Sequence, residues 1–117
     1  MATMAPMDSD RLKALADDNR VAIVGLLAER ERCVCELADR LGLSEALISH
    51  HVKRLHAAGI VSTRRVGRWL HCRLDGGGIG ELAEDLRRLA EAAQVAPRTS
   101  EAACSGAKVE PKVTACG

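Results

Sequence analysis

The stretch from Glu36 to Leu55, ELADRLGLSEALISHHVKRL, constrains the fold of this chain more than any other. Gly42 tolerates the left-handed conformation that ends helices, and Ser44 is suited to cap a new helix two residues later. The second helix then has one apolar stripe that faces the core, made of Ile48, Val52 and Leu55. The sequence therefore predicts a helix over about residues 34–41, a tight turn and a second helix.

The other face of the second helix is polar and basic. A helix of this kind after a tight turn fits the major groove of duplex DNA, with residues near its N-terminus at base edges and basic residues at phosphates. An ordinary solvated helix face would have the same composition. The candidate DNA contacts on this helix and its cap are Ser44, Ser49, His50, Lys53 and Arg54.

A basic hairpin follows this helix pair. Residues 60–66 and 69–74 have strand composition, and the short Gly67-Arg68 turn between them places Arg64, Arg65 and Arg68 at or near the tip. Residues 40–73 contain seven basic residues against one acidic residue, a net +6 in a chain whose total is +1. A helix-turn-helix with a basic hairpin is a winged helix-turn-helix, and it predicts binding to double-stranded DNA through these three arginines as well.

The flanking segments complete a mainly α fold with a small β-hairpin. Residues 11–30 predict two helices broken at Asp17-Asp18-Asn19, and a long helix follows Gly76-Gly77-Gly78. The buried faces of the first two helices are Leu12, Leu15, Ile23, Leu26 and Leu27. The terminal helix carries a narrow seam, Ile79, Leu82, Leu86, Leu89 and Ala93, that suits a homodimer through terminal helices. We expect residues 1–95 to form the DNA-binding and dimerisation domain and residues 96–117 a flexible tail with two cysteines.

Five cysteines, in a chain without a secretion signal or a membrane-spanning run, indicate thiol chemistry in the reducing cytoplasm. Cys33 and Cys35 are only two residues apart, a spacing at which a disulfide between them is not expected. On a helix their side chains would point about 200° apart, whereas in extended chain they share a face. Cys33 is therefore predicted just before a helix or in its first turn, where the helix N-terminus favours thiolate.

These motifs resemble the ArsR/SmtB family of metal-sensing winged-helix repressors. The resemblance covers roughly residues 12–74 and includes the Asp-Asn-Arg opening of the second helix, the pattern S-x-x-I-S-H-H-V-K-x-L, the exit A-G-I-V and the wing R-x-G-R-W. It implies a homodimeric repressor that binds operator DNA and releases it on binding a toxic or surplus ion, with no organic cofactor and no small-molecule substrate.

The resemblance also suggests the site of that ion. The CVC at Cys33 and Cys35 looks like the thiolate site of the family's arsenite and cadmium or lead sensors, which implies Cd(II), Pb(II) or As(III) as inducer. The arsenite pattern often has a third cysteine where this chain has Ala38, and two sulfurs are too few for these ions. Cys104 and Cys116 are therefore the candidate remaining ligands, while Cys72 is expected to be a core residue, with a ligand role as the alternative.

Two other functions use the same cysteines. A thiol-redox repressor would form a disulfide between Cys33 or Cys35 and Cys104 or Cys116, and a cytoplasmic metal buffer would bind ions without needing the basic helix and wing. An enzyme is not expected, because the sequence contains no catalytic triad pattern, no phosphate-binding glycine loop and no C-x-x-C pair.

Overall fold

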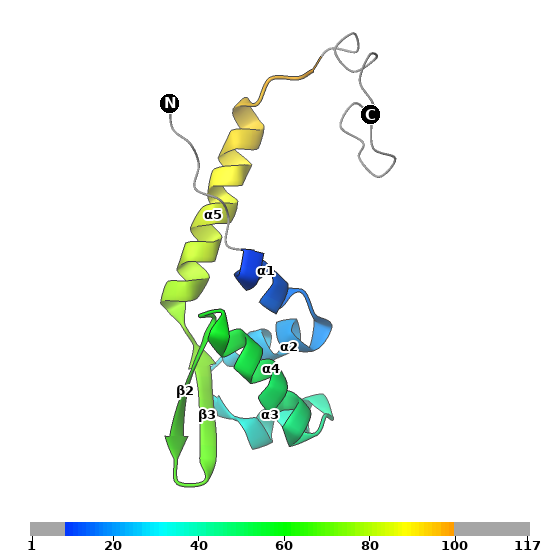
Figure 1. The fold of residues 1–117 in the computed structure, drawn as a ribbon, viewed down its shortest axis with the longest axis vertical. Helices are drawn as coiled ribbons and strands as arrows, with labels where there is room; N and C mark the ends of the chain where they lie inside the picture. Colours follow the sequence, from blue (N-terminus) through cyan, green and yellow to red (C-terminus); the bar gives the residue numbers. More distant parts are fainter. Residues whose placement is uncertain (1–8, 100–117) are drawn as a thin grey trace. The chain divides into compact units, whose positions relative to one another are not determined.

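A computed structural model of the chain describes residues 9–99 (Figure 1). Its elements in order are α1 (Ser9–Leu15), α2 (Asp18–Leu27), β1 (Arg32–Cys33), α3 (Val34–Leu41), α4 (Glu45–Ala57), β2 (Val61–Val66), β3 (Trp69–Leu74) and α5 (Gly76–Val95). The chain divides into two compact units after Arg87. Within residues 9–99, no helix has the length and apolar character needed to cross a membrane.

The break between the first two helices lies where the sequence predicts it. Asp17 is the N-cap of α2, and its Oδ1 accepts hydrogen bonds from the backbone N–H groups of Asn19 and Arg20, at 2.9 and 3.2 Å. These bonds satisfy donors that have no partner inside the helix. The prediction for Leu12 was wrong: its side chain is 37% exposed, and the smaller Ala14 is the buried residue of α1.

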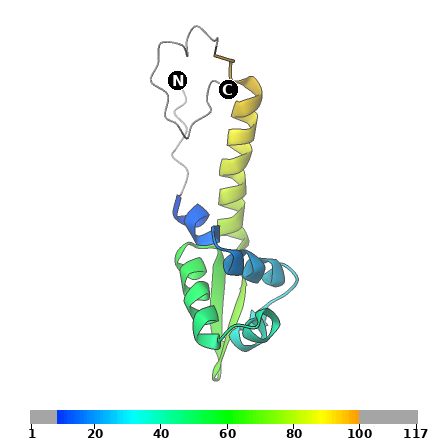
Figure 2. The ribbon, with the colours of Figure 1, turned by 90° about the vertical axis from the view of Figure 1, so that its right-hand side faces the viewer.

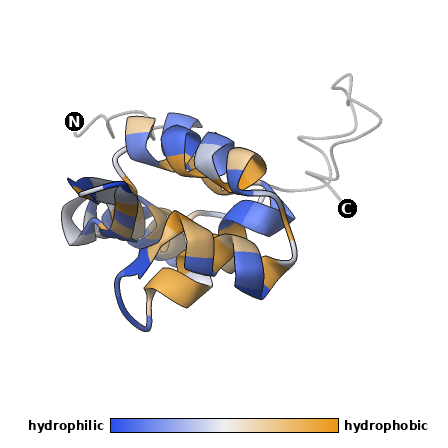
Figure 3. Cartoon of the chain, turned by 90° about the horizontal axis from the view of Figure 1, so that it is seen from below, coloured by the Kyte–Doolittle hydropathy of each residue, from blue (hydrophilic) through white to orange (hydrophobic). Residues whose placement is uncertain are grey.

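The helix-turn-helix prediction is confirmed. Helix α3 ends at Leu41, with Gly42 in the left-handed conformation at φ +66°, and Ser44 caps α4 by accepting a hydrogen bond from the Leu47 N–H at 3.1 Å. The predicted inner stripe of Ile48, Val52 and Leu55 is buried. The helices carry hydrophobic and hydrophilic residues on different sides (Figure 3), as amphipathic helices around a core do.

The predicted hairpin is present but belongs to a three-stranded sheet of order β1-β3-β2. Strands β2 and β3 form a long hairpin beside α4 (Figure 2), and Gly67 supplies the positive φ, +62°, of its two-residue turn. The strand β1 has only two residues, Arg32 and Cys33, which pair with Cys72 and His71 of β3. The segment before α3 is thereby joined to the sheet by backbone pairing.

The terminal helix begins at Gly76 and includes the glycine run that was predicted to precede it. In the unit that ends at Arg87, Leu82 is 5% exposed and Ile79 packs on the core, whereas Leu86 is 47% exposed. In the second unit, Leu89 is 44% exposed. The seam predicted from the sequence therefore begins with Ile79 on the core and Leu82 buried, whereas the next two apolar side chains are exposed to solvent.

One titratable side chain of α4 is buried. His51 is 6% exposed, and its Nδ1 and Nε2 accept or donate no hydrogen bond within the described part of the chain. Burial lowers the pKa of His51 below its ordinary value of 6.5, the charges of Arg20 and His50 lower it further, and Asp17 acts in the opposite direction. His51 therefore stays neutral in the folded protein at pH values where an exposed histidine would gain a proton.

We predict that Gly78→Ala destabilises the protein. A methyl group at Gly78 would overlap the backbone carbonyl of Gly59, and backbone atoms on both sides leave little room to adjust. Such overpacking costs about 1 to 3 kcal/mol. Gly80→Ala is the matched control: a methyl group there meets nothing within 4 Å, and alanine should stabilise the helix by about 0.5 to 1 kcal/mol. Urea unfolding of both variants checks the prediction, and equal midpoints would contradict it.

We also predict a pH dependence of stability that comes from His51. The pKa of His51 is lower in the folded chain, so this contribution to stability is full above about pH 6.5 and is lost as the pH falls toward the folded-state pKa. His51→Leu removes the group and should flatten the dependence between about pH 7 and pH 5. The carboxylates whose pKa is lowered by the fold titrate below this range. Urea unfolding at several pH values tests this, and an unchanged slope in the variant would refute it.

Candidate functional site

The two neighbouring cysteines lie at the junction of β1 and α3. Cys33 has extended backbone, at φ −83° and ψ 161°, and is the N-cap of α3; its Sγ accepts a hydrogen bond from the Glu36 N–H at 3.3 Å. Cys35 follows in the first turn. The predicted position of Cys33, just before the helix, is confirmed. Both sulfurs lie at the positive end of the helix dipole, which stabilises a thiolate.

The expectation that Cys33 and Cys35 would not bond to each other was wrong. The structure joins them by a disulfide, with their Cα atoms 5.4 Å apart. Disulfides are found at Cα separations of this size. The separation arises because Cys33 is extended and Cys35 is helical, so the chain turns between the two residues and directs both side chains to the same place. The two sulfurs are therefore close enough to bind one atom between them once the disulfide is reduced.

A buried arginine holds this segment in place. The Arg32 side chain is 2% exposed; its Nε donates to the Leu26 carbonyl at 3.0 Å and its Nη2 to Glu29 at 2.6 Å, while its Nη1 donates to Glu36. Arg30 also binds Glu36. Burial raises the pKa of Glu36, but the hydrogen bonds from Arg30 and Arg32 outweigh it, so the net pKa is lowered and the carboxylate stays charged.

Of the three other cysteines, only Cys72 is among the residues that the structure describes. Cys72 is fully buried on the inner face of the sheet, and burial raises its pKa to about 11. A thiol with that pKa remains protonated near neutral pH, which favours the core role over the ligand role. Cys104 and Cys116 lie outside the described residues. Among residues 9–99, no group of three or more histidine, cysteine, aspartate or glutamate side chains is placed to hold a metal ion.

The structure brings together some of the predicted DNA contacts. Ser49, Lys53 and Arg65 line one groove between α4 and the hairpin, together with Thr63 and His56. The sequence reasoning did not single out Thr63, whose register opposite Cys72 becomes visible only when the strands are paired. His50 and Arg68 are exposed, and the hydroxyl of Ser44 caps α4.

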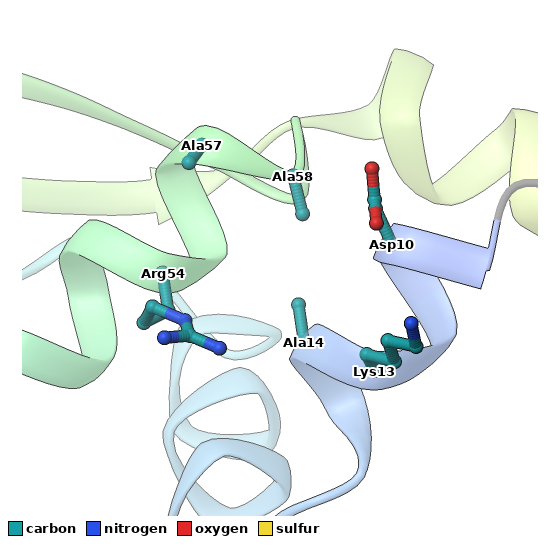
Figure 4. A pocket seen from close by; sticks show the side chains of 6 residues that line it. All are labelled: Asp10, Lys13, Ala14, Arg54, Ala57 and Ala58. Atoms are coloured by element: carbon teal, nitrogen blue, oxygen red, sulfur yellow. The ribbon is translucent and has the colours of Figure 1, made fainter.

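Two predicted contacts lie apart from that groove. Arg54 is on the side of α4 that faces α1, where it lines a pocket with Asp10, Lys13 and Ala14 (Figure 4). Arg64 forms a two-point ion pair with Glu31, with distances of 3.1 Å from Nε and 2.7 Å from Nη2. The sequence reasoning missed Glu31, which is 33 positions away along the chain.

Comparison with known proteins places these features in a family. A family model described as "Bacterial regulatory protein, arsR family" matches residues 17–63. The arsenic resistance transcriptional regulator ArsR1 of Pseudomonas putida is 49% identical over 63 residues, which cover 53% of this chain and 49% of that protein. The chain thus spans about half the length of this curated relative.

Two further comparisons extend over more of the chain. The solution NMR structure of a homodimeric winged helix-turn-helix domain from Mycobacterium bovis, a possible ArsR-family regulator, is 27% identical with a TM-score of 0.59, covering 80% of this chain and 86% of that one. The cadmium resistance regulatory protein CadC homolog of Staphylococcus aureus is 38% identical over 86 residues, 72% of this chain and 71% of that protein. The extent of this last match, with the winged helix-turn-helix fold, shows that the chain belongs to the arsR family of bacterial regulatory proteins.

Proposed function

We propose that the chain is a homodimeric repressor that binds operator DNA and releases it when Cd(II), Pb(II) or As(III) binds the thiolates of Cys33 and Cys35. The observation that carries the proposal is the position of these two sulfurs. They converge at the start of α3, and only the turn around Gly42 separates α3 from the helix α4 that would read the DNA. A change at the sulfurs therefore acts close to the DNA-binding surface.

The donor set fits a soft ion only in part. Thiolates prefer soft ions over Mg²⁺ or Mn²⁺, and the reduced form of the pair is needed, as expected for a protein of the reducing cytoplasm. Two sulfurs leave the coordination of these ions incomplete, and residues 9–99 offer no third ligand beside them. We propose that Cys104 and Cys116 supply the remaining sulfurs, from the same subunit or from its partner.

The surface for DNA is made of α4 and the hairpin. Ser49 and Lys53 would meet the duplex from α4, and Arg65 from β2, because the three line one groove. Ser44, His50, Arg54 and Arg68 would add contacts around it, and Arg64 would do so when it is not bound to Glu31. Basic groups in this arrangement bind phosphate and make affinity fall with salt.

Release of DNA requires that the ion prefer one of two states. An ion with equal affinity for the DNA-bound and the released conformation would shift nothing. Couplings between two sites are typically about 1 to 3 kcal/mol, or about 5- to 150-fold in affinity. Several relatives are named for arsenic or cadmium resistance and as transcriptional regulators or repressors, which supports ion-responsive regulation over thiol-redox sensing or a metal buffer.

We predict that Cys33→Ser or Cys35→Ser abolishes the response to ions but leaves operator binding by the ion-free protein intact. Each change removes one of the two converging sulfurs and leaves α4 and the hairpin unaltered. The measurement is the affinity of reduced protein for a duplex from upstream of its own gene, by fluorescence anisotropy, with Cd(II), Pb(II) or As(III) added in turn. Near-ultraviolet absorption reports sulfur-to-ion bonds in the same samples.

Matched variants separate the roles of the other cysteines. Cys72→Ala should keep the full response, because that thiol is buried and protonated. The double change of Cys104 and Cys116 to serine should weaken ion binding, and an unchanged stoichiometry and affinity would remove the tail from the site. Wild-type protein that holds the duplex equally tightly with and without each ion would refute the proposed function.

We further predict that Leu86→Glu together with Leu89→Glu converts a dimer to a monomer. Both side chains are nearly half exposed in the described residues, and a charge on each would oppose burial in a helix pair. Analytical ultracentrifugation at several concentrations measures the change. A double variant that sediments as the wild type does would show that the two copies meet elsewhere.

A further inference from the structure

The sheet has two faces with different residues. In the register β1-β3-β2, Cys33, His71 and Arg64 lie in one row across the three strands, and the next row is Arg32, Cys72 and Thr63. Arg32 and Cys72 are buried, so their row faces the core. Directly paired residues share a face of a sheet, and successive residues alternate. Cys33 and Arg64 therefore project from the same outer face.

Glu31 joins the two ends of this outer row. It precedes β1 by one residue and lies two residues before Cys33, so the alternation of the extended chain directs it to the same face. Its two carboxylate oxygens accept hydrogen bonds from Nε and Nη2 of Arg64, at 3.1 and 2.7 Å. His71 Nδ1 lies 4.0 Å from the same carboxylate. The segment that contains the thiols is thus bonded to the hairpin by a side-chain pair as well as by the β1–β3 backbone pairing.

The pair joins a carboxylate to a guanidinium at two points, with 3.1 Å from Nε and 2.7 Å from Nη2 of Arg64. This is the two-point geometry of an arginine–carboxylate pair. The Arg64 side chain is 61% exposed and the Glu31 side chain 30%. A pair that solvent reaches is weak and can exchange partners.

The two-point geometry makes Glu31 a competitor of DNA. An arginine binds a carboxylate or a phosphate with the same planar set of N–H groups, so the edge of Arg64 that holds Glu31 is not available to a phosphate. Arg65 is not affected in this way, because its side chain lines the groove on the α4 side. Only one of the two adjacent arginines is therefore linked to the thiol segment.

We propose that Glu31 is a positioning residue that carries the state of the Cys33–Cys35 site to the hairpin by competing with DNA phosphate for Arg64. The inference rests on the proposed function and extends it by naming the two residues, Glu31 and Arg64, that connect the thiols to the hairpin. The proposed direction assigns to the ion-bound protein the arrangement seen in the structure, in which the two sulfurs are held together and Arg64 is bound to Glu31. An ion that bridges the sulfurs holds them together as well, so ion binding favours Glu31–Arg64 pairing and DNA binding favours its opening.

The test is operator affinity of the full-length reduced chain with and without Cd(II), for wild type and for Glu31→Gln. The variant keeps the shape of the side chain but removes its charge, so Arg64 should remain available to phosphate in both states. We expect the loss of affinity caused by Cd(II) to be about two- to fivefold smaller than in wild type, the range that an exposed ion pair supplies. The salt dependence of the Cd(II)-bound protein should become steeper, since one more cation meets the DNA.

Two controls make the result specific to Arg64. Glu45→Gln removes a charge at the start of α4, outside this pair, and should change affinity equally with and without Cd(II). In an Arg64→Gln background, Glu31→Gln should have no further effect on the Cd(II) response. Unfolding midpoints check that every variant is folded.

The possible results distinguish failure of this inference from failure of the proposed function. If wild-type protein releases DNA on adding Cd(II) and Glu31→Gln releases it by the same factor, the inference is overturned and the proposed function stands. The same holds if Glu31→Gln acts equally in the Arg64→Gln background. If wild-type protein does not respond to Cd(II), Pb(II) or As(III), the proposed function fails and the inference fails with it.

Discussion

The buried guanidinium of Arg32 is the interaction on which the arrangement of the thiol segment depends. It binds the last turn of α2 through the Leu26 carbonyl, and it binds α3 through Glu36. Isolated buried ion pairs often add little to stability, because desolvation offsets the attraction between the charges. Their clearer effect is on geometry, since a planar group with several donors is satisfied in few orientations. Arg32 therefore fixes where β1 ends and α3 begins, and with that the position of Cys33.

The helical part of the fold could be predicted because its signals are local. Asp17 and Ser44 cap helices through bonds to residues two or three positions away, and Gly42 ends a helix through its own backbone conformation. Residues such as Ile48 and Leu55 show their burial by their spacing on one helix. In each case the physical cause lies within about one helical turn of the residue, so it can be recognised from the neighbouring residues in the sequence.

The remaining features depend on contacts between distant segments. A strand of two residues, as in β1, is too short to leave a periodic pattern, and its pairing with β3 was not predicted. The ion pair between Glu31 and Arg64 joins distant positions that come together because β1 pairs with β3 of the hairpin. The disulfide was excluded from spacing alone, which assumed one conformation for both cysteines, whereas the chain changes from extended to helical between Cys33 and Cys35. The burial of His51 was not predicted either, because it depends on how the elements around α4 pack against it.

The register of the hairpin gives its two adjacent arginines different neighbours. Arg64 and Arg65 have the same side chain, yet one faces a carboxylate and the other faces the groove beside α4. The period of a strand is two residues, so an insertion or deletion of a single residue in β2 exchanges their faces. The basic character of the hairpin would be the same after such a change, but the residue opposite His71 would differ: Arg65 after an insertion next to the turn, and Thr63 after a deletion there. Two wings of the same composition can therefore place different arginines beside the thiol segment, according to whether an odd or an even number of residues separates each arginine from the turn.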